Sequence, residues 1–345
     1  MFLKTTHHQF LRWIERACFF TIVLAMVGCA FFQPQPEETI ESQTRPTLPY
    51  EFTVVTVQPG DSLSSLAKKH LRNPSLGWVI AEVNDIDVLT PGQMLIIPLS
   101  PLERGGITLR GYQTVPILTY HKFSDTGKDV VTVLRKSFED QMRFLKNQGY
   151  RVISLDEFFD FLELRQPIPQ KSVVITIDDG WRSAYDIAFP ILKKYGYPAT
   201  LFVYTDFIID GNKNLNWSIL REMMQGGISI QSHTKTHRYL DRRIGRETFK
   251  QYFESIKEEL SESAMIIQRH LGKEVKYLAY PYGETNHLVI AMLEKLGYRG
   301  ALTVERESNP CFVNRYRVNR SMVYGNFDLE DFTNNLKVFN NQVPK

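Results

Sequence analysis

The chain carries the stretch VVITIDDG at residues 173–180, an apolar run that ends in two carboxylates and a glycine. A short, continuous apolar run of this kind indicates a strand that is buried on both faces, as in a parallel sheet. Further strand candidates lie at residues 117–120, 151–154, 200–203, 228–231, 277–279 and 300–303, and helical patterns lie between them at residues 138–147, 184–195, 249–269 and 288–296. This alternation predicts an α/β domain, and about seven strand–helix units predict that its parallel sheet closes into a barrel.

Ionisable side chains follow two of these strand candidates. Asp178 and Asp179 fall at a strand end, which is where barrel enzymes keep their chemistry. The run at 228–230 is followed by SHTKTH at residues 232–237, which offers two imidazoles. One carboxylate with two histidines is a ligand set for a divalent metal that leaves positions open for water and substrate. The other carboxylate is then free to act as a base beside that water.

A third motif, YPYG at residues 280–283, completes a set that resembles the NodB-type polysaccharide deacetylases, carbohydrate esterase family 4. The resemblance implies a distorted (β/α)7 barrel and a hydrolase that removes acetyl groups from a polysaccharide. By the same resemblance, Asp178 is the general base, and the backbone N–H of Tyr282 helps to hold the oxyanion. The metal ligands it implies are Asp179, His233 and His237. Zinc is the first choice of metal, although cobalt, nickel or iron would fit the same ligands.

Two features depart from the family pattern. Ala279 stands where the third motif has an arginine that orients the base. The missing positive charge could come from Arg182, Arg317 or Arg320. The late motifs of the family are not found after residue 283, but Tyr120-His121 resembles the Y-H element of the subgroup that deacetylates poly-N-acetylglucosamine. We therefore predict His121 as the general acid, with a capping or core histidine as the alternative.

The first fifty residues predict targeting outside the cytoplasm. Basic residues precede an apolar stretch at residues 17–32, which is long enough for a signal segment and short for a bilayer span. Within it, Met26-Val27-Gly28-Cys29 resembles a lipobox. We expect a signal or lipoprotein segment at residues 1–30 and a flexible linker at 31–51, with an uncleaved anchor or simple secretion as alternatives. The expected location is the cell envelope, with a lipid anchor in the membrane.

Residues 52–99 form a separate pattern of strand, two helices and strand. VQPGDSL lies at its start and LTPGQMLIIP at its end, and together they resemble a LysM domain, which binds chains that contain N-acetylglucosamine. The resemblance implies glycan contacts from Gly60, Asp61, Ser62, Asn84, Asp85 and Ile86. For most of these residues the alternative is turn and capping chemistry.

The chain as a whole has 345 residues, a formal charge of +3 and 43% hydrophobic residues, and it has no basic block interleaved with aromatics. We expect no nucleic-acid partner. The main prediction is an N-deacetylase domain at residues 112–340 that acts on peptidoglycan or poly-N-acetylglucosamine. The alternatives are an O-acetyl esterase on a xylan-like glycan and a catalytically silent glycan-binding protein. Trp181 and Tyr282 could stack on sugar faces, with core packing as the alternative for Trp181.

Overall fold

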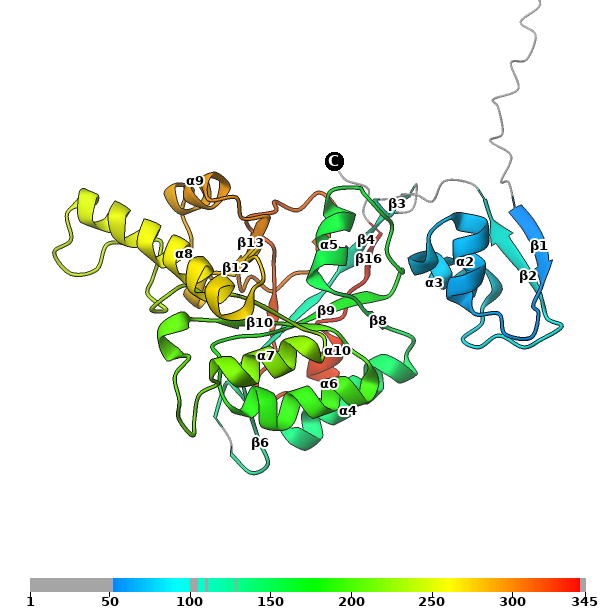
Figure 1. Ribbon diagram of the computed structural model, residues 1–345, viewed down its shortest axis with the longest axis horizontal. Coiled ribbons are helices and arrows are strands. Elements are labelled where there is room, and N and C mark those ends of the chain that lie inside the picture. Colours follow the sequence, from blue (N-terminus) through cyan, green and yellow to red (C-terminus); the bar gives the residue numbers. More distant parts are fainter. Residues whose placement is uncertain (1–51, 100–104, 109–110, 128, 342–345) are drawn as a thin grey trace, which may run out of the picture. The chain divides into compact units, whose positions relative to one another are not determined.

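The computed structural model describes residues 52–99, 105–108, 111–127 and 129–341 (Figure 1). The predicted signal or lipoprotein segment, with Cys29, and the predicted linker lie outside these residues. Within the described ranges, no helix combines the length and the apolar character that a membrane crossing requires.

Residues 52–98 fold as the predicted βααβ unit. Strand β1 (Phe52–Thr56) pairs in antiparallel register with β2 (Met94–Pro98). Between them lie α2 (Leu63–Leu71), the short 3₁₀ turn η1 (Pro74–Leu76) and α3 (Gly77–Asn84). Ser62 is the N-cap of α2: its side chain accepts from the backbone N–H of Ser65, and the Ser65 hydroxyl accepts from Ser62 in return. A small apolar core holds the helices on the sheet; it contains Val57, Leu66, Ala67, Ile80, Leu95 and Ile97.

Several of the predicted glycan contacts in this unit have structural partners. The Asn84 amide donates to the carbonyls of Ile80 (2.8 Å) and Ile96 (2.7 Å), and its oxygen accepts from the Ile96 N–H (2.8 Å). Asp61 accepts from the Gln58 N–H at 2.8 Å. Asp85 ends α3 with a left-handed φ of 50°. These residues therefore shape the turns of the unit, and their contact with a glycan stays a prediction.

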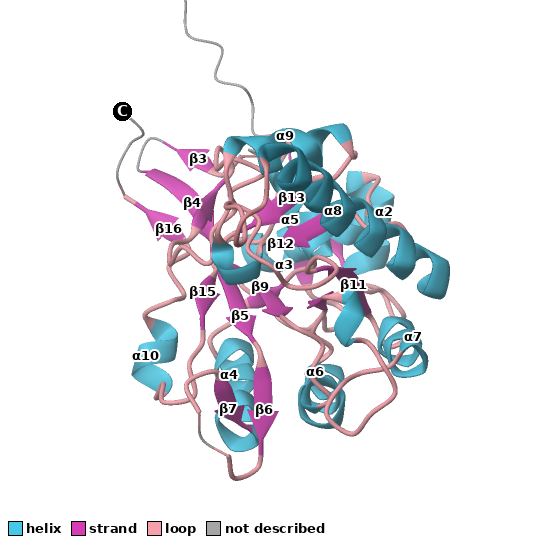
Figure 2. Cartoon of the chain, turned by 90° about the vertical axis from the view of Figure 1, so that its left-hand side faces the viewer, coloured by secondary structure: helices cyan, strands magenta, loops and turns pink. Residues whose placement is uncertain are grey.

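The larger sheet is a parallel sheet that curls into a distorted barrel, as predicted (Figure 2). Its strands are β5 (Ile117–Tyr120), β9 (Ser172–Ile177), β10 (Ala199–Val203), β11 (Ile228–Ser232), β12 (Tyr277–Ala279), β13 (Gly300–Leu302) and β15 (Ser321–Met322). They run in the order β13-β12-β11-β10-β9-β5-β15, and every neighbouring pair is parallel. A parallel bridge between Leu302 and Val318 links the end strand β13 to the segment that leads into β15.

One predicted barrel strand was wrong and one barrel strand was not predicted. The candidate at residues 151–154 forms only the two-residue strand β8 (Arg151–Val152), which pairs with β9 and lies off the main order of strands. The seventh barrel strand is instead β15. No local pattern predicts this strand, because β15 has only two residues and follows Asn319 and Arg320 rather than an apolar run.

Helices and short strands complete the domain. Helices α4 (Arg135–Asn147), α6 (Phe189–Tyr195), α7 (Trp217–Gln225) and α8 (Phe249–Leu271) lie on the outer side of the sheet (Figure 2). The remaining elements are β3 (Ile107–Thr108), β4 (Gly111–Val115), β6 (Lys122–Ser124), β7 (Thr132–Leu134), α5 (Leu155–Leu162), the π-turn η2 (Ala184–Ala188), η3 (Thr205–Phe207), η4 (Pro281–Gly283), α9 (His287–Lys295), β14 (Asn309–Pro310), α10 (Leu329–Thr333) and β16 (Phe339–Asn340). Strands β3, β14 and β16 pair antiparallel with β4.

The two faces of β9 belong to different cores. Val173, Ile175 and Ile177 pack in the cluster that includes the outer helices. Val174 packs in a second cluster with residues of α5 and of the neighbouring strands. Because side chains alternate along a strand, Thr176 and Asp178 continue the face of Val174. The alternation of side chains along β9 therefore places the Asp178 side chain on the inner face of the barrel.

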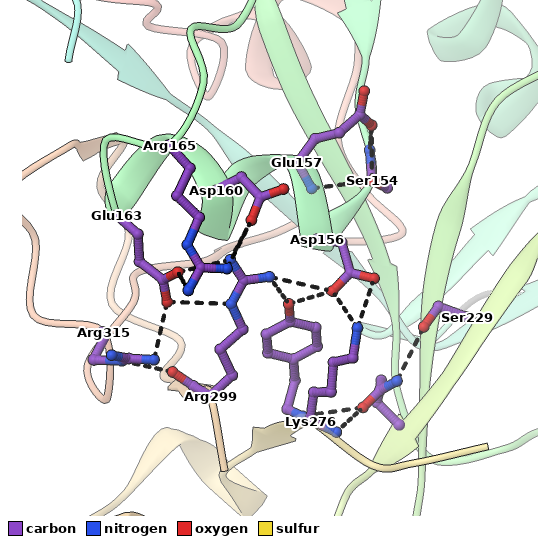
Figure 3. Close-up of polar contacts among 12 residues, drawn as sticks. Ser154, Asp156, Glu157, Asp160, Glu163, Arg165, Ser229, Lys276, Arg299 and Arg315 are labelled. Atoms are coloured by element: carbon purple, nitrogen blue, oxygen red, sulfur yellow. Dashed lines mark hydrogen bonds and ion pairs between the residues drawn. The ribbon is translucent and has the colours of Figure 1, made fainter. Parts of the chain in front are cut away.

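A network of charged side chains holds α5 to the amino-terminal ends of β12 and β13 (Figure 3). The Arg299 guanidinium donates to Glu163 (3.0 and 3.2 Å) and to the Tyr277 hydroxyl (3.1 Å), and it also pairs with Asp160. The Arg299 side chain is only 16% exposed. Residues at the amino-terminal ends of barrel strands usually contribute to stability rather than to chemistry, and this network fits that role.

We expect Arg299→Met to lower the free energy of unfolding by about 2 kcal/mol, because several charge-assisted hydrogen bonds are lost at once. Arg165 is the matched control, since it also pairs with Glu163 (2.8 Å) but is 65% exposed. Arg165→Met should cost less than about 0.5 kcal/mol. Urea unfolding followed by circular dichroism measures both, and equal losses would contradict the role given to Arg299.

Candidate active site

The turn after β9 separates the two aspartates. Asp179 has a φ of 79° and Gly180 a φ of 100°. The φ of Gly180 lies where residues with a side chain are rarely found, so the turn needs glycine here for its conformation; a Cβ atom would also lie 2.7 Å from the Cδ1 atom of Ile208, which would have to shift. Asp178 is buried inside the barrel, and Asp179 lies next to it at the carboxyl edge with its side chain 16% exposed.

Asp179, His233 and His237 converge as predicted. One ligand atom from each residue lies within 4.8 Å of the other two. The Asp179 Oδ1 atom is 3.6 Å from His233 Nε2 and 3.5 Å from His237 Nε2. Two atoms that are each about 2.1 Å from one ion at a tetrahedral angle lie about 3.4 Å apart. These residues therefore fit a divalent metal site, and the remaining coordination positions stay open.

Hydrogen bonds from other residues orient the three candidate ligands toward the point where a metal ion would bind. His233 Nδ1 lies 2.8 Å from the Ala279 carbonyl, so it carries the proton and leaves Nε2 free to bind a cation. The Trp181 indole N–H donates to Asp179 Oδ2 at 2.9 Å, which leaves Oδ1 for the ion. The Trp181 ring contacts Phe207 edge-on, and the Lys122 ammonium lies 4.1 Å from the ring centroid. Trp181 thus supports a candidate metal ligand, a role that the sequence did not suggest.

The protonation states suit a cation. Burial lowers the pKa of His233 and of His237 below the usual value, although the nearby carboxylates act in the opposite direction. Both rings are therefore neutral near pH 7, which is the form that binds a metal.

Asp178 has a buried cationic partner, Arg320, which directly precedes the unpredicted strand β15. The Arg320 Nη1 and Nη2 atoms donate to the two carboxylate oxygens of Asp178 at 2.8 and 2.9 Å. The Arg320 Nε–H donates to the Thr303 carbonyl at 2.9 Å, and Arg320 is fully buried. Burial would raise the pKa of Asp178, but Arg320 and His233 outweigh it and hold the pKa at about 2.

Of the three arginines that could replace the missing motif arginine, only Arg320 contacts Asp178. Arg182 pairs with Asp186 at 3.0 Å, and Arg317 pairs with Glu305 at 3.4 Å. The Asp178 Oδ2 atom lies 3.9 Å from His233 Nε2, so the carboxylate faces the ligand set without belonging to it. Ala279 therefore departs from the motif, but Arg320 provides the positive charge beside the candidate base Asp178.

His121 and Tyr282 lie at the same edge of the barrel. Tyr120 is opposite Ile177 in the β5–β9 register, and the Asp178 N–H donates to the Tyr120 carbonyl at 2.9 Å. His121 therefore follows β5 at the level where Asp178 follows β9, and its charge helps to lower the pKa of Asp178. The Tyr282 ring stacks on Tyr239 with centroids 4.0 Å apart and meets the His237 ring edge-on at 4.8 Å.

Backbone strain gathers at these positions. Seven described residues other than glycine have positive φ, and four of them are Asp179, Thr234, His237 and Tyr282. Such conformations persist where many surrounding contacts hold them in place, and they are typical of functional sites.

A buried glutamate, Glu259, accepts hydrogen bonds from the loop that carries His237. Sequence analysis did not identify it as a site residue.

Sequence comparisons agree with this geometry. The LysM domain family matches residues 55–98, and the polysaccharide deacetylase family matches residues 165–301. YxkH of Bacillus subtilis strain 168, named as a polysaccharide deacetylase, is 31% identical over 214 residues, which are 60% of this chain and 72% of that protein. The poly-β-1,6-N-acetyl-D-glucosamine N-deacetylase of Staphylococcus aureus strain MRSA252 is 28% identical over 208 residues, 58% of this chain and 71% of that protein.

Solved structures share the fold. The Streptococcus pyogenes deacetylase PplD, in complex with acetate, superposes with a TM-score of 0.60 at 25% identity over 66% of this chain and 99% of that chain. IcaB from Ammonifex degensii superposes with a TM-score of 0.56 at 26% identity over 62% of this chain and 93% of that chain. The chain therefore belongs to the polysaccharide deacetylases of carbohydrate esterase family 4, and it carries a LysM domain ahead of its deacetylase domain.

Proposed function

We propose that this enzyme is a metal-dependent hydrolase that removes N-acetyl groups from a polysaccharide containing N-acetylglucosamine, either peptidoglycan or poly-N-acetylglucosamine. The proposal depends above all on one observation: a buried, arginine-paired aspartate faces the Asp179, His233 and His237 set at the carboxyl edge of the barrel. The LysM domain supports a glycan of this class, and the similarity to the Staphylococcus aureus enzyme supports N-acetyl rather than O-acetyl groups.

Each proposed residue has one task in amide hydrolysis. A divalent ion at this site, with zinc as the first choice, would polarise the acetamide carbonyl and lower the pKa of a water when it is bound. Asp178 would take the proton of the water that attacks the carbonyl carbon. The backbone N–H of Tyr282 would donate to the oxygen that gains negative charge. His121 would give a proton to the nitrogen as the C–N bond breaks, because an unprotonated amine anion is a poor leaving group.

The decisive experiment measures acetate release by the purified protein on peptidoglycan, poly-N-acetylglucosamine and acetylxylan in parallel. Release from one of the first two, lost with a chelator and restored by zinc, is the expected result. Release from acetylxylan alone would indicate an O-acetyl esterase instead. Binding to a glycan without any acetate release would indicate a catalytically silent protein.

We expect His121→Ala to lower kcat by about 10²-fold with metal content unchanged. The loss should stay at the lower end for a general acid, because His121 is only half-buried and solvent can deliver some of the proton. Steady-state kinetics with metal analysis checks this, and His287→Ala is the control, since His287 begins α9. An unchanged kcat would remove His121 from the proposed mechanism.

We also propose that Cys29 carries a lipid that anchors the enzyme in the cell envelope, with its catalytic domain facing the periplasm or the exterior. This proposal depends on the lipobox-like sequence at residues 26–29 alone. Mass spectrometry of the mature N-terminus tests it. An acylated chain that begins at Cys29 is expected, whereas an unmodified chain that begins before Cys29 excludes lipidation.

A further inference from the structure

One face of helix α8 holds the loop between β11 and His237. The face is made of Glu258, Glu259, Glu262 and Ser263. Glu258 and Glu262 are four residues apart, as are Glu259 and Ser263, and Glu259 and Glu262 are three apart, so the four residues share one side of the helix. Lys235 reaches outward to Glu258 (2.8 Å) and Glu262 (2.7 Å). The inner contacts of the face involve Glu259 and Ser263, both of which are buried.

Glu259 makes three hydrogen bonds to the loop and is only 4% exposed. Its Oε2 atom accepts from the backbone N–H groups of Lys235 and Thr236, each at 2.9 Å. Its Oε1 atom accepts from the Thr236 hydroxyl at 2.6 Å. The carboxylate thus satisfies two consecutive N–H groups directly before His237.

The loop that receives these bonds is strained at both of its ends. Thr234 has a φ of 72° and His237 a φ of 65°, and residues other than glycine hold such conformations only when their surroundings stabilise them. Ser232 links the first end to the helix: its hydroxyl lies 2.6 Å from that of Ser263 and accepts from the Thr234 N–H at 3.1 Å. The Thr234 hydroxyl accepts from the His237 N–H at 3.1 Å. These bonds hold the loop in its strained conformation.

We propose that Glu259 is a positioning residue of the metal centre, which sets the affinity for the metal by holding the 234–236 loop so that the His237 ring meets Asp179 and His233. The inference depends on the proposed function, because it assumes that these three residues bind a metal. It goes beyond it by assigning the control of metal affinity to a helix residue that touches none of the ligand atoms. A merely structural Glu259 would change stability and leave the metal affinity unchanged.

Three substitutions separate the possible effects of Glu259. Glu259→Ala removes all three bonds and should weaken zinc binding by about 10- to 100-fold. Glu259→Asp keeps the charge but withdraws the carboxylate by one methylene, and it should weaken binding by about tenfold. Glu259→Gln should bind zinc within about threefold of wild type, because the amide oxygen can still accept from both N–H groups. Ile267→Ala is the control: this core residue lies about 12 Å along α8 from Glu259, so it should lower stability without changing zinc affinity.

Zinc affinity is measured on the full chain by competition with a chromophoric chelator, and each variant is also melted. We expect the wild type, Ile267→Ala and Glu259→Gln to bind zinc with similar, high affinity. Glu259→Asp should bind more weakly, and Glu259→Ala most weakly of all. Equal affinities for wild type and Glu259→Ala or Glu259→Asp overturn the inference while leaving the metal site in place. Weak binding by Glu259→Gln with full binding by Glu259→Asp also overturns it, because charge rather than position would then matter. A wild-type chain that binds no zinc, cobalt, nickel or iron overturns the proposed function itself.

Discussion

Replacing Arg320 by methionine is expected to lower the free energy of unfolding by about 3–5 kcal/mol, because it leaves the buried Asp178 carboxylate without its cation. Methionine fills much of the arginine volume, so the loss reports mainly the missing charge and hydrogen bonds rather than a cavity. The bonds that disappear are those to both Asp178 oxygens, to the Thr303 carbonyl and to the Thr176 hydroxyl. Unfolding in urea at pH 7, followed by circular dichroism, measures the change.

The same substitution should change the pH dependence of stability. In the wild-type chain the pKa of Asp178 is about 2, below its usual 3.8, so the ionised group adds stability that is lost as the pH falls through that range. Without Arg320, burial remains the largest influence on this carboxyl, so we expect the pKa of Asp178 to rise above its usual value. The variant then gains stability from this group as the pH falls. The difference in unfolding free energy between wild type and variant should therefore narrow from pH 7 toward pH 4.

Arg317 provides the matched control for Arg320. It lies three residues earlier and pairs with Glu305 at 3.4 Å, but its side chain is 47% exposed. Arg317→Met should cost less than about 1 kcal/mol at any of these pH values. The double variant Asp178→Asn/Arg320→Met should recover part of the stability lost by Arg320→Met, because no unpaired charge is then buried. Similar losses for Arg317→Met and Arg320→Met would contradict the special role of the buried pair.

The barrel could be predicted from the sequence because most of its strands are short apolar runs that are buried on both faces. The run at 173–177 is an example: it lies within β9 (Ser172–Ile177), all six residues of which are buried. Strand β15 breaks this rule, since its register beside β5 depends on Leu118 and Thr119 rather than on its own composition. The candidate at 151–154 has suitable β-branched residues, but it pairs for only two residues with β9. Pairing partners far along the chain decide such short strands, and a local pattern does not contain them.

The residues of the candidate site also fall into two groups, those that the sequence predicts and those that it does not. The motif residues Asp179, His233 and His237 could be predicted to meet because each follows a strand of one parallel sheet. The supporting roles of Glu259 and Trp181 could not, and Arg320 was only one of three candidate arginines, because these residues have ordinary neighbours in the sequence and act through contacts that only the folded chain creates. An arginine in a charged segment is usually at the surface, and nothing local distinguishes Arg320, which is buried, from Arg317, which is not. The contribution of a charged residue to a site thus depends on desolvation, which the sequence does not show.

Asp178→Asn is expected to lower kcat by about 10⁴-fold while the protein still binds its metal. The amide has no basic oxygen that could take a proton from the attacking water, and no other described carboxylate except the ligand Asp179 lies within 4.0 Å of the two histidines. The loss should reach the upper end for a general base because Asp178 is buried, so solvent cannot replace it as it can partly replace His121. Acetate release, with metal content measured on the same sample, tests this.

A substitution of Asp179, the proposed metal ligand, distinguishes its role from that of Asp178, the proposed base. Asp179→Asn removes the oxygen that lies 3.5 and 3.6 Å from the two histidine nitrogens, so it should lose metal and activity together, and added zinc should restore part of the activity. Excess zinc should not restore Asp178→Asn, because its defect is the missing base. An Asp178→Asn protein that regains activity with zinc would instead make Asp178 a ligand. The contrast depends on the turn at Gly180, which sends one carboxylate inward to Arg320 and the other outward to the histidines.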